Sequence, residues 1–165
     1  NLLTDAFPAL ALGMEAKEPN IMKRPPRNPN EPILDKQMNW QIAIQSTFMT
    51  IAVLGVFVFS LNNTSNLEIA RTYAFATLIF SELLRAYTSR SETLSVFKIG
   101  FFSNKFMVGG TLVSFLLLLV VLYVPALREI FDTVKLSIYD WDVIVLFGIM
   151  PFLAAEISKM FLKTK

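Results

Sequence analysis

Three oxygen-bearing side chains at the start of the sequence have a spacing that could create a cation site. Asn1, Thr4 and Asp5 stand at i, i+3 and i+4, so a helix would bring them to one face. Amide, hydroxyl and carboxylate oxygens are ligands of hard cations such as Ca²⁺. Pro8 lacks an N–H and is expected to disturb the hydrogen bond to Thr4. The pattern predicts a cation site on a broken helix; the alternative is a polar helix end with Asp5 facing water.

A further carboxylate, Glu82, lies within an apolar stretch. A charge inside a membrane span is costly unless it is paired, protonated or bound to a cation, so it suggests a functional site. Arg85 follows at i+3, where it could form an ion pair with Glu82 near the membrane interface. The sequence therefore leaves two interpretations of Glu82 open, a cation ligand or the partner of Arg85.

The composition is that of a helical membrane protein. Hydrophobic residues make up 54% of the 165 residues and charged residues only 17%, below the roughly 25% of soluble domains. The formal charge of +2 and the absence of a basic, aromatic cluster argue against nucleic acid as a partner. Because the sequence has no Cys and no His, disulfides, thiolate nucleophiles and the usual zinc ligands are excluded.

The elements that must position these side chains are apolar segments. Residues 1–13 would reach only about 20 Å as a helix, short of the roughly 30 Å hydrocarbon core. Four full-length spans are expected at about residues 40–61, 69–87, 106–124 and 143–162. Within them, Gly109 and Gly110 should allow close helix contact, and Pro151 should kink the last span. Glu156 and Lys159 are expected to form an interfacial, snorkelling pair.

The distribution of basic residues predicts the orientation of these spans. Arg71, Arg128 and Lys135 lie on one side of the predicted membrane, and the other twelve basic residues lie on the opposite side. By the positive-inside rule, the side with twelve is cytoplasmic, with four spans and both chain ends inside. The polar connection after residue 13 then lies in the cytoplasm.

The first part of the sequence resembles a known family. The stretch NLLTDAFPALALGME at residues 1–15, followed by IMKRPPR at residues 21–27, is similar to the P-type calcium-transporting ATPases. It looks like their sixth transmembrane helix and the cytoplasmic loop after it, and the resemblance continues more weakly over the rest of the chain. It implies that Asn1, Thr4 and Asp5 are cation ligands, with Asp5 central, and that Glu82 is an acidic ligand on the eighth helix. Animal relatives usually have a neutral amide at the position of Arg85, so this departure bears on whether one cation binds or two.

The resemblance also implies a division of the chain. Residues 1–13 would be the second part of a discontinuous ion-binding helix, residues 14–39 a cytoplasmic coupling loop, and residues 40–165 a four-helix transmembrane bundle. The loop would contact the phosphorylation domain through the residues Lys23, Arg24, Pro25, Pro26 and Arg27. An ordinary solvated connector is the alternative for this loop.

The activity implied by the resemblance needs more than these residues. The family forms an aspartyl-phosphate from ATP with Mg²⁺ and drives Ca²⁺ out of the cytoplasm in exchange for protons. Those domains, and the earlier transmembrane helices, are expected in a longer parent protein, because the sequence starts inside a motif; alone, the chain should hydrolyse no ATP. The short tail and loops favour a bacterial plasma membrane. A pump for Na⁺, K⁺, Mg²⁺ or Mn²⁺, or a non-catalytic helical scaffold, are the alternatives.

Overall fold

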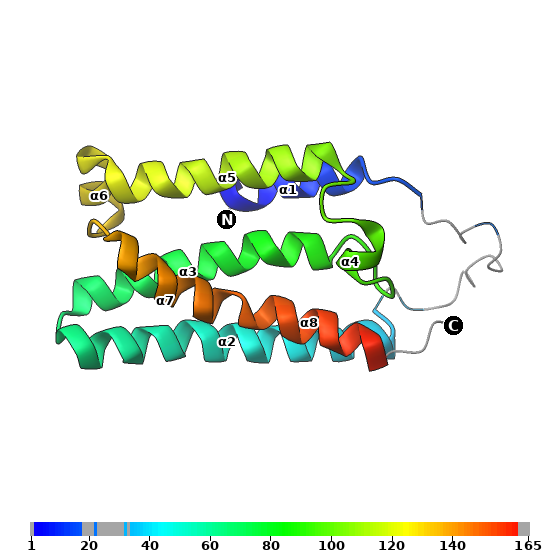
Figure 1. Ribbon diagram of the computed structural model, residues 1–165, viewed down its shortest axis with the longest axis horizontal. Helices are drawn as coiled ribbons and strands as arrows, with labels where there is room; N and C mark the ends of the chain where they lie inside the picture. The colour runs from blue at the N-terminus through cyan, green and yellow to red at the C-terminus, as the bar shows by residue number, and fades with distance from the viewer. Residues whose placement is uncertain (1, 18–21, 23–31, 33, 162–165) are drawn as a thin grey trace.

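The protein is a bundle of long helices lying side by side (Figure 1). The computed structural model describes residues 2–17, 22, 32 and 34–161, and the helices are all the regular structure in this part of the chain. This confirms the prediction of an all-α membrane protein. The elements are α1 (Leu2–Gly13), α2 (Lys36–Thr64), α3 (Leu67–Thr88), α4 (Val96–Ile99), α5 (Lys105–Tyr123), α6 (Pro125–Phe131), α7 (Ile138–Gly148) and α8 (Met150–Phe161).

Three of the long helices begin at an Asn or Asp that caps the first turn. The Oδ1 atom of Asp35 accepts from Met38 N at 2.7 Å at the start of α2, and Asn66 and Asn104 cap α3 and α5 in the same way. Such side chains satisfy backbone N–H groups that have no partner within the helix. These caps explain why α2 begins four residues before the predicted span at residue 40.

Three segments of the described chain are long and apolar enough to cross a membrane, judged by length and composition. They are α2, α5 and the combined segment Ile138–Phe161. The second predicted span corresponds to α3, a helix of 22 residues that also carries Glu68, Arg71, Glu82 and Arg85. Since α3 contacts α1, α2, α5, α7 and α8, it occupies the middle of the bundle, where a helix needs less apolar surface.

The connections are more ordered than the sequence predicts. The expected loop at residues 88–105 contains α4, which is capped by Ser95, and the expected loop at residues 126–142 contains α6 and the start of α7. Pro125 directly follows the predicted span at residues 106–124 and opens α6, because its fixed φ suits the first turn of a helix. The last span is interrupted between α7 and α8, next to Pro151, where a kink was predicted.

Helix α1 is a half-length element that starts about midway along α5 and runs to the end of the bundle where α4 lies (Figure 1). It packs against α5 and α3. A Cβ at Gly110 would lie 3.0 Å from the carbonyl oxygen of Phe7, so glycine lets the two backbones approach. A Cβ added at Gly109 would have no neighbouring atom within 4 Å. The predicted close helix contact is therefore made by Gly110.

Candidate cation site and its supporting network

A cavity of about 200 Å³ lies between α1 and α3 and brings two of the predicted ligands to one place. Asp5 reaches it from α1 and Glu82 from α3, although they are far apart in the sequence. The full lining is Asp5, Pro8, Ala9, Leu12, Glu82, Arg85, Ala86 and Ser89. Two carboxylates beside one cavity form an arrangement that can attract and bind a cation.

The Arg85 side chain lies in the same cavity and is paired with Glu82. Its Nε atom donates to Oε2 of Glu82 at 2.7 Å. The side chains of Arg85 and Glu82 are 45% and 25% exposed, so the pair is open to one side. The i, i+3 pairing proposed from the sequence is thus present, and it places the guanidinium group beside the Glu82 carboxylate.

A second cavity, of about 320 Å³, lies on the α2 side of the same ion pair. Besides Glu82 and Arg85, its lining comprises Ile42, Gln45, Ser46, Met49 and Thr50 of α2. This polar lining was not predicted, because the sequence indicated only an apolar span at residues 40–61. The signal was present in the polar side chains of Gln45, Ser46 and Thr50, which cluster in the first half of that helix.

Several predicted site residues fall outside what the structure describes. Asn1, the side chain of Thr4 and the coupling-loop residues Lys23, Arg24, Pro25, Pro26 and Arg27 are among them. Convergence of Asn1 and Thr4 with Asp5 therefore stays a prediction. Over the described residues, no group of three or more His, Cys, Asp or Glu side chains could hold a metal ion. The predicted break in the helix does not occur, since α1 continues through Pro8 to Gly13.

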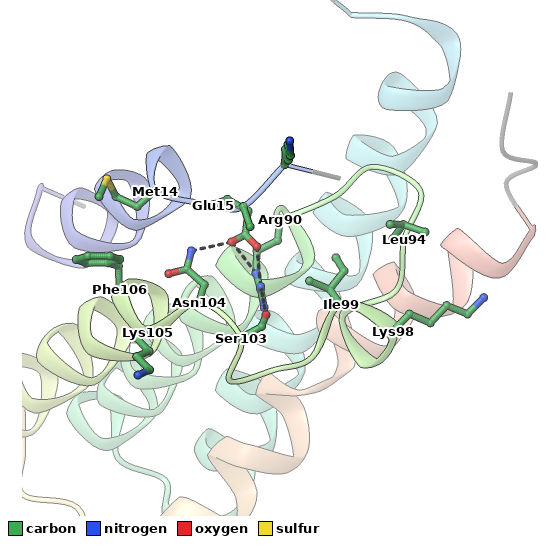
Figure 2. A pocket seen from close by; sticks show the side chains of 12 residues that line it. Met14, Glu15, Arg90, Leu94, Lys98, Ile99, Ser103, Asn104, Lys105 and Phe106 are labelled. Atoms are coloured by element: carbon green, nitrogen blue, oxygen red, sulfur yellow. Dashed lines mark hydrogen bonds and ion pairs between the residues drawn. The ribbon is translucent and has the colours of Figure 1, made fainter. Parts of the chain in front are cut away.

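A buried ion pair between Glu15 and Arg90 lies just past the C-terminal end of α1 (Figure 2). Arg90 donates from Nε and Nη2 to the two carboxylate oxygens of Glu15, at 2.9 and 2.7 Å. Its remaining donors reach Gly100 O at 2.9 Å and Ser103 Oγ at 2.6 Å. Asn104 Nδ2 bonds both to Glu15 Oε2 at 2.7 Å and to Ala11 O at 3.0 Å. The ends of α1 and α3 and the start of α5 are therefore held by one network.

The electrostatics of this network follow from its geometry. The hydrogen bonds from Arg90 hold the pKa of the Glu15 carboxyl below its usual value, against the opposing effect of burial, and Asn104 adds to the lowering. Sequence analysis counted Arg90 only as a basic loop residue and assigned nothing to Glu15. No local signal joins the two, because 75 residues separate them.

Beside the ion pair is a cavity of about 510 Å³. In addition to Glu15 and Arg90, its lining comprises Met14, Ala16, Lys17, Leu94, Lys98, Ile99, Ser103, Asn104, Lys105 and Phe106. Figure 2 shows the side chains of Lys98 and Lys105 extending away from the ion pair in different directions. Lys98 and Lys105 thus do not form a single binding group around Glu15.

A second buried ion pair joins α8 to the connection between α3 and α5. Lys159 Nζ lies 3.0 Å from Glu156 Oε1 and donates to Thr88 O at 2.7 Å. Glu156 Oε2 accepts from Ser95 Oγ at 2.6 Å and from Val96 N at 3.0 Å. The pairing predicted from the i, i+3 spacing is correct, but the prediction of snorkelling is wrong. Both side chains are buried inside the protein, because the α4 connection supplies their hydrogen-bond partners.

These features together define a helical membrane protein in which a half-length helix and a central helix share a cavity lined by carboxylates. The chain belongs to the family described as "Cation transporting ATPase, C-terminus", whose profile matches residues 1–161.

Similar proteins come from bacteria, yeast and mammals. The chain is 40% identical to "Calcium-transporting ATPase" of Bacillus subtilis (strain 168), over 92% of this chain and 17% of that protein. It is 32% identical to "Calcium-transporting ATPase 1" of Yarrowia lipolytica, over 100% of this chain and 18% of that protein. It is 34% identical to "Calcium-transporting ATPase type 2C member 1" of Homo sapiens, over 85% of this chain and 15% of that protein. The chain thus spans less than a fifth of the length of these relatives.

Proposed function

We propose that this chain is the C-terminal membrane part of an ATP-driven P-type pump that exports Ca²⁺ from the cytoplasm. The observation that carries the proposal is the cavity between α1 and α3, where Asp5 and Glu82 face the same space. Membership of the cation-transporting ATPase family and the names of the relatives support the choice of Ca²⁺.

In this proposal Asp5 is the central ligand of the dehydrated cation. Asn1 and Thr4 complete its shell with amide and hydroxyl oxygens, which suit the hard Ca²⁺ ion. Glu82 is a secondary ligand in this set, because it is already bonded to Arg85. A positive guanidinium group beside the cavity disfavours a second cation, so a single ion per cycle is expected. When the ion leaves, protonation of the carboxylate reduces the cost of the empty site, which accounts for proton exchange.

The chemistry of ATP belongs to other parts of the protein. The proposed pump has cytoplasmic domains that bind ATP and Mg²⁺ and form the aspartyl-phosphate, and earlier transmembrane helices that complete the ion path. The connection between α1 and α2 passes their movement to α1 through Lys23, Arg24, Pro25, Pro26 and Arg27. The lipid bilayer surrounds the bundle, and a bacterial plasma membrane is the proposed location. This chain by itself hydrolyses no ATP.

The test is calcium-dependent ATP hydrolysis by the full-length protein with Mg²⁺ present throughout. Stimulation by micromolar Ca²⁺ alone is expected, and Asp5→Asn should reduce calcium-dependent phosphorylation to background, since the central charge is lost. Stimulation by Mn²⁺, Na⁺ or K⁺ instead of Ca²⁺ would overturn the choice of ion. Full calcium-dependent phosphorylation of the Asp5→Asn variant would overturn the assignment of Asp5.

A further inference from the structure

The ion pair between Glu15 and Arg90 connects the two helices that form the proposed cation cavity. Glu15 lies just past the end of α1, ten residues after Asp5, and Arg90 lies just past the end of α3, eight residues after Glu82. At about 1.5 Å per helical residue, each cavity carboxylate is roughly 12 to 15 Å from the ion pair. The pair therefore joins α1 to α3 at one end, and the cavity extends along the same two helices from Leu12 and Ser89, near the pair, to Asp5 and Glu82.

The ion pair holds Glu15 and Arg90 in a fixed geometry. The Arg90 side chain is completely buried, and each of its three guanidinium nitrogens donates a hydrogen bond, to Glu15, Gly100 or Ser103. A bidentate contact between Arg and a carboxylate fixes both distance and orientation. Glu15 retains 17% exposure through the neighbouring cavity (Figure 2). Removing either partner would leave a charge with poor compensation, so the two helix ends hold each other in place.

The position of Glu15 in the chain adds a second argument. The polar connection after α1 begins at this residue, and any movement of that connection reaches α1 through Glu15. The other tight contact of α1 described above is the backbone approach of Phe7 to Gly110 of α5, which lies at the level of the cavity, between Asp5 and Pro8 in the sequence. With α1 held to α5 at Phe7, the end of α1 can move relative to α3 only if the Glu15–Arg90 ion pair yields.

We propose that the Glu15–Arg90 ion pair is a positioning device that sets the separation of α1 and α3 at the cation cavity and thereby sets cation affinity. Glu15 and Arg90 are positioning residues that do not touch the ion. The effect on affinity rests on the proposed function, whereas the effect on α1 does not. Breaking the pair releases the end of α1 and disfavours the arrangement of the helices that binds the cation.

The first experiment measures amide hydrogen exchange along α1 in the full-length protein, which needs no assumption about transport. Glu15→Gln should increase exchange at residues 9–13 by roughly tenfold or more, the effect of losing about one charge-assisted hydrogen bond. Arg71→Gln is the matched control, because it breaks an exposed ion pair with Asp132 that does not involve α1. Equal exchange in Glu15→Gln and in wild type would overturn the proposal.

The second experiment measures phosphorylation from ATP against Ca²⁺ concentration. In Glu15→Gln the half-saturating Ca²⁺ concentration should rise roughly 3- to 30-fold, as expected for a coupling between distant sites. The half-saturating ATP concentration should not change. An unchanged Ca²⁺ requirement in the variant, with a normal response of wild type, overturns the inference but not the proposed function. A wild-type protein without any Ca²⁺ response overturns the proposed function, and the exchange experiment still decides whether the pair holds α1.

A double variant separates loss of the pair from damage by an unpaired charge. Glu15→Leu with Arg90→Met removes both charges at similar volume, a change that folded proteins commonly tolerate. It should show the same raised Ca²⁺ requirement as Glu15→Gln. If the double variant had the wild-type half-saturating Ca²⁺ concentration, the defect would come from the unpaired Arg90 charge and not from the loss of the ion pair. That result would overturn the proposal.

Discussion

The two ends of the bundle are held together by different interactions. At the end that carries α4, two buried ion pairs, Glu15–Arg90 and Glu156–Lys159, join helix ends to the α4 connection. At the opposite end the ion pair between Arg71 and Asp132 is exposed, with 3.8 Å between Nη1 and Oδ2. Hydrogen bonds from Tyr and Trp side chains, and one from Val134 N to Thr72 Oγ1, provide further links at that end.

The difference shows where the fold needs a fixed geometry. Buried ion pairs are poor sources of net stability, but they define position and orientation closely. They occur at the end where the polar connection between α1 and α2 begins, which is the connection proposed to transmit domain movement. The opposite end carries the turn between α2 and α3 and the connection that contains α6, where packing, side-chain hydrogen bonds and an exposed ion pair are sufficient. Four predictions test this comparison.

The largest effect is expected from Lys159→Met. The substitution leaves the Glu156 carboxylate buried without its cationic partner, which typically costs about 3 to 5 kcal/mol. Hydrogen exchange of α8 and of the α4 connection in the full-length protein measures this loss as a drop in the free energy of local unfolding. In the double variant Glu156→Gln with Lys159→Met, the free energy of local unfolding should fall by less. If Lys159→Met kept the wild-type protection of these amides from exchange, the stability of this end of the bundle would not depend on the ion pair.

A smaller effect is expected at the other end from Tyr73→Phe. The hydroxyl group of Tyr73 donates to Asp140 Oδ1 at 2.6 Å and connects α3 to the first turn of α7. Loss of a hydrogen bond to a charged group costs about 1.5 to 3 kcal/mol, visible as faster exchange at the start of α7. Tyr139→Phe is the control, since Tyr139 is exposed. Equal effects of the two substitutions would contradict the role given to Tyr73.

The pH dependence of the α4 end should follow from Glu15. Because the folded state lowers the pKa of this carboxyl below its ordinary 4.5, the unfolded state binds more protons on acidification. The stabilisation is thus fully present above about pH 4.5 and is lost as the pH falls through the lower folded value. Protection of α1 measured from pH 7 downward should show this loss, and Glu15→Gln should remove it. A wild-type profile as flat as that of the variant would exclude Glu15 as its source.

The smallest effect is expected from Arg71→Gln. The side chains of Arg71 and Asp132 are 58% and 79% exposed, and exposed pairs contribute about 0 to 1 kcal/mol. Raising the salt concentration should weaken whatever contribution exists. A loss above about 1 kcal/mol in the protection of α6 would mean that the two ends are more alike than their exposure indicates.

Sequence reasoning predicted the features that depend on local composition or spacing. The apolar segments located the long helices, and the i, i+3 spacings predicted the pairs Glu82–Arg85 and Glu156–Lys159. It misplaced the helix ends by a few residues because caps such as Asp35 extend a helix beyond its apolar part.

Features that depend on long-range packing could not be predicted in this way. The partnership of Glu15 with Arg90 requires α1, α3 and α5 to meet, and no periodicity encodes that meeting. Burial of Lys159 likewise depends on carbonyl groups supplied by Thr88 and Leu94. The sequence did predict that Asp5 and Glu82 are candidates for one site, through the family resemblance rather than through spacing.

The interruption between α7 and α8 is a fixed joint and not a hinge. A helix break leaves a carbonyl group in need of a donor, and here Ser81 Oγ of α3 donates to Gly148 O at 3.0 Å. A Cβ at position 148 would come within 2.6 Å of the Phe80 ring, so the bend leaves no free space on that side. Bending the joint further would expel the aromatic ring and break the bond to Ser81. The segment formed by α7 and α8 should therefore keep its bend and move together with α3 as one rigid body.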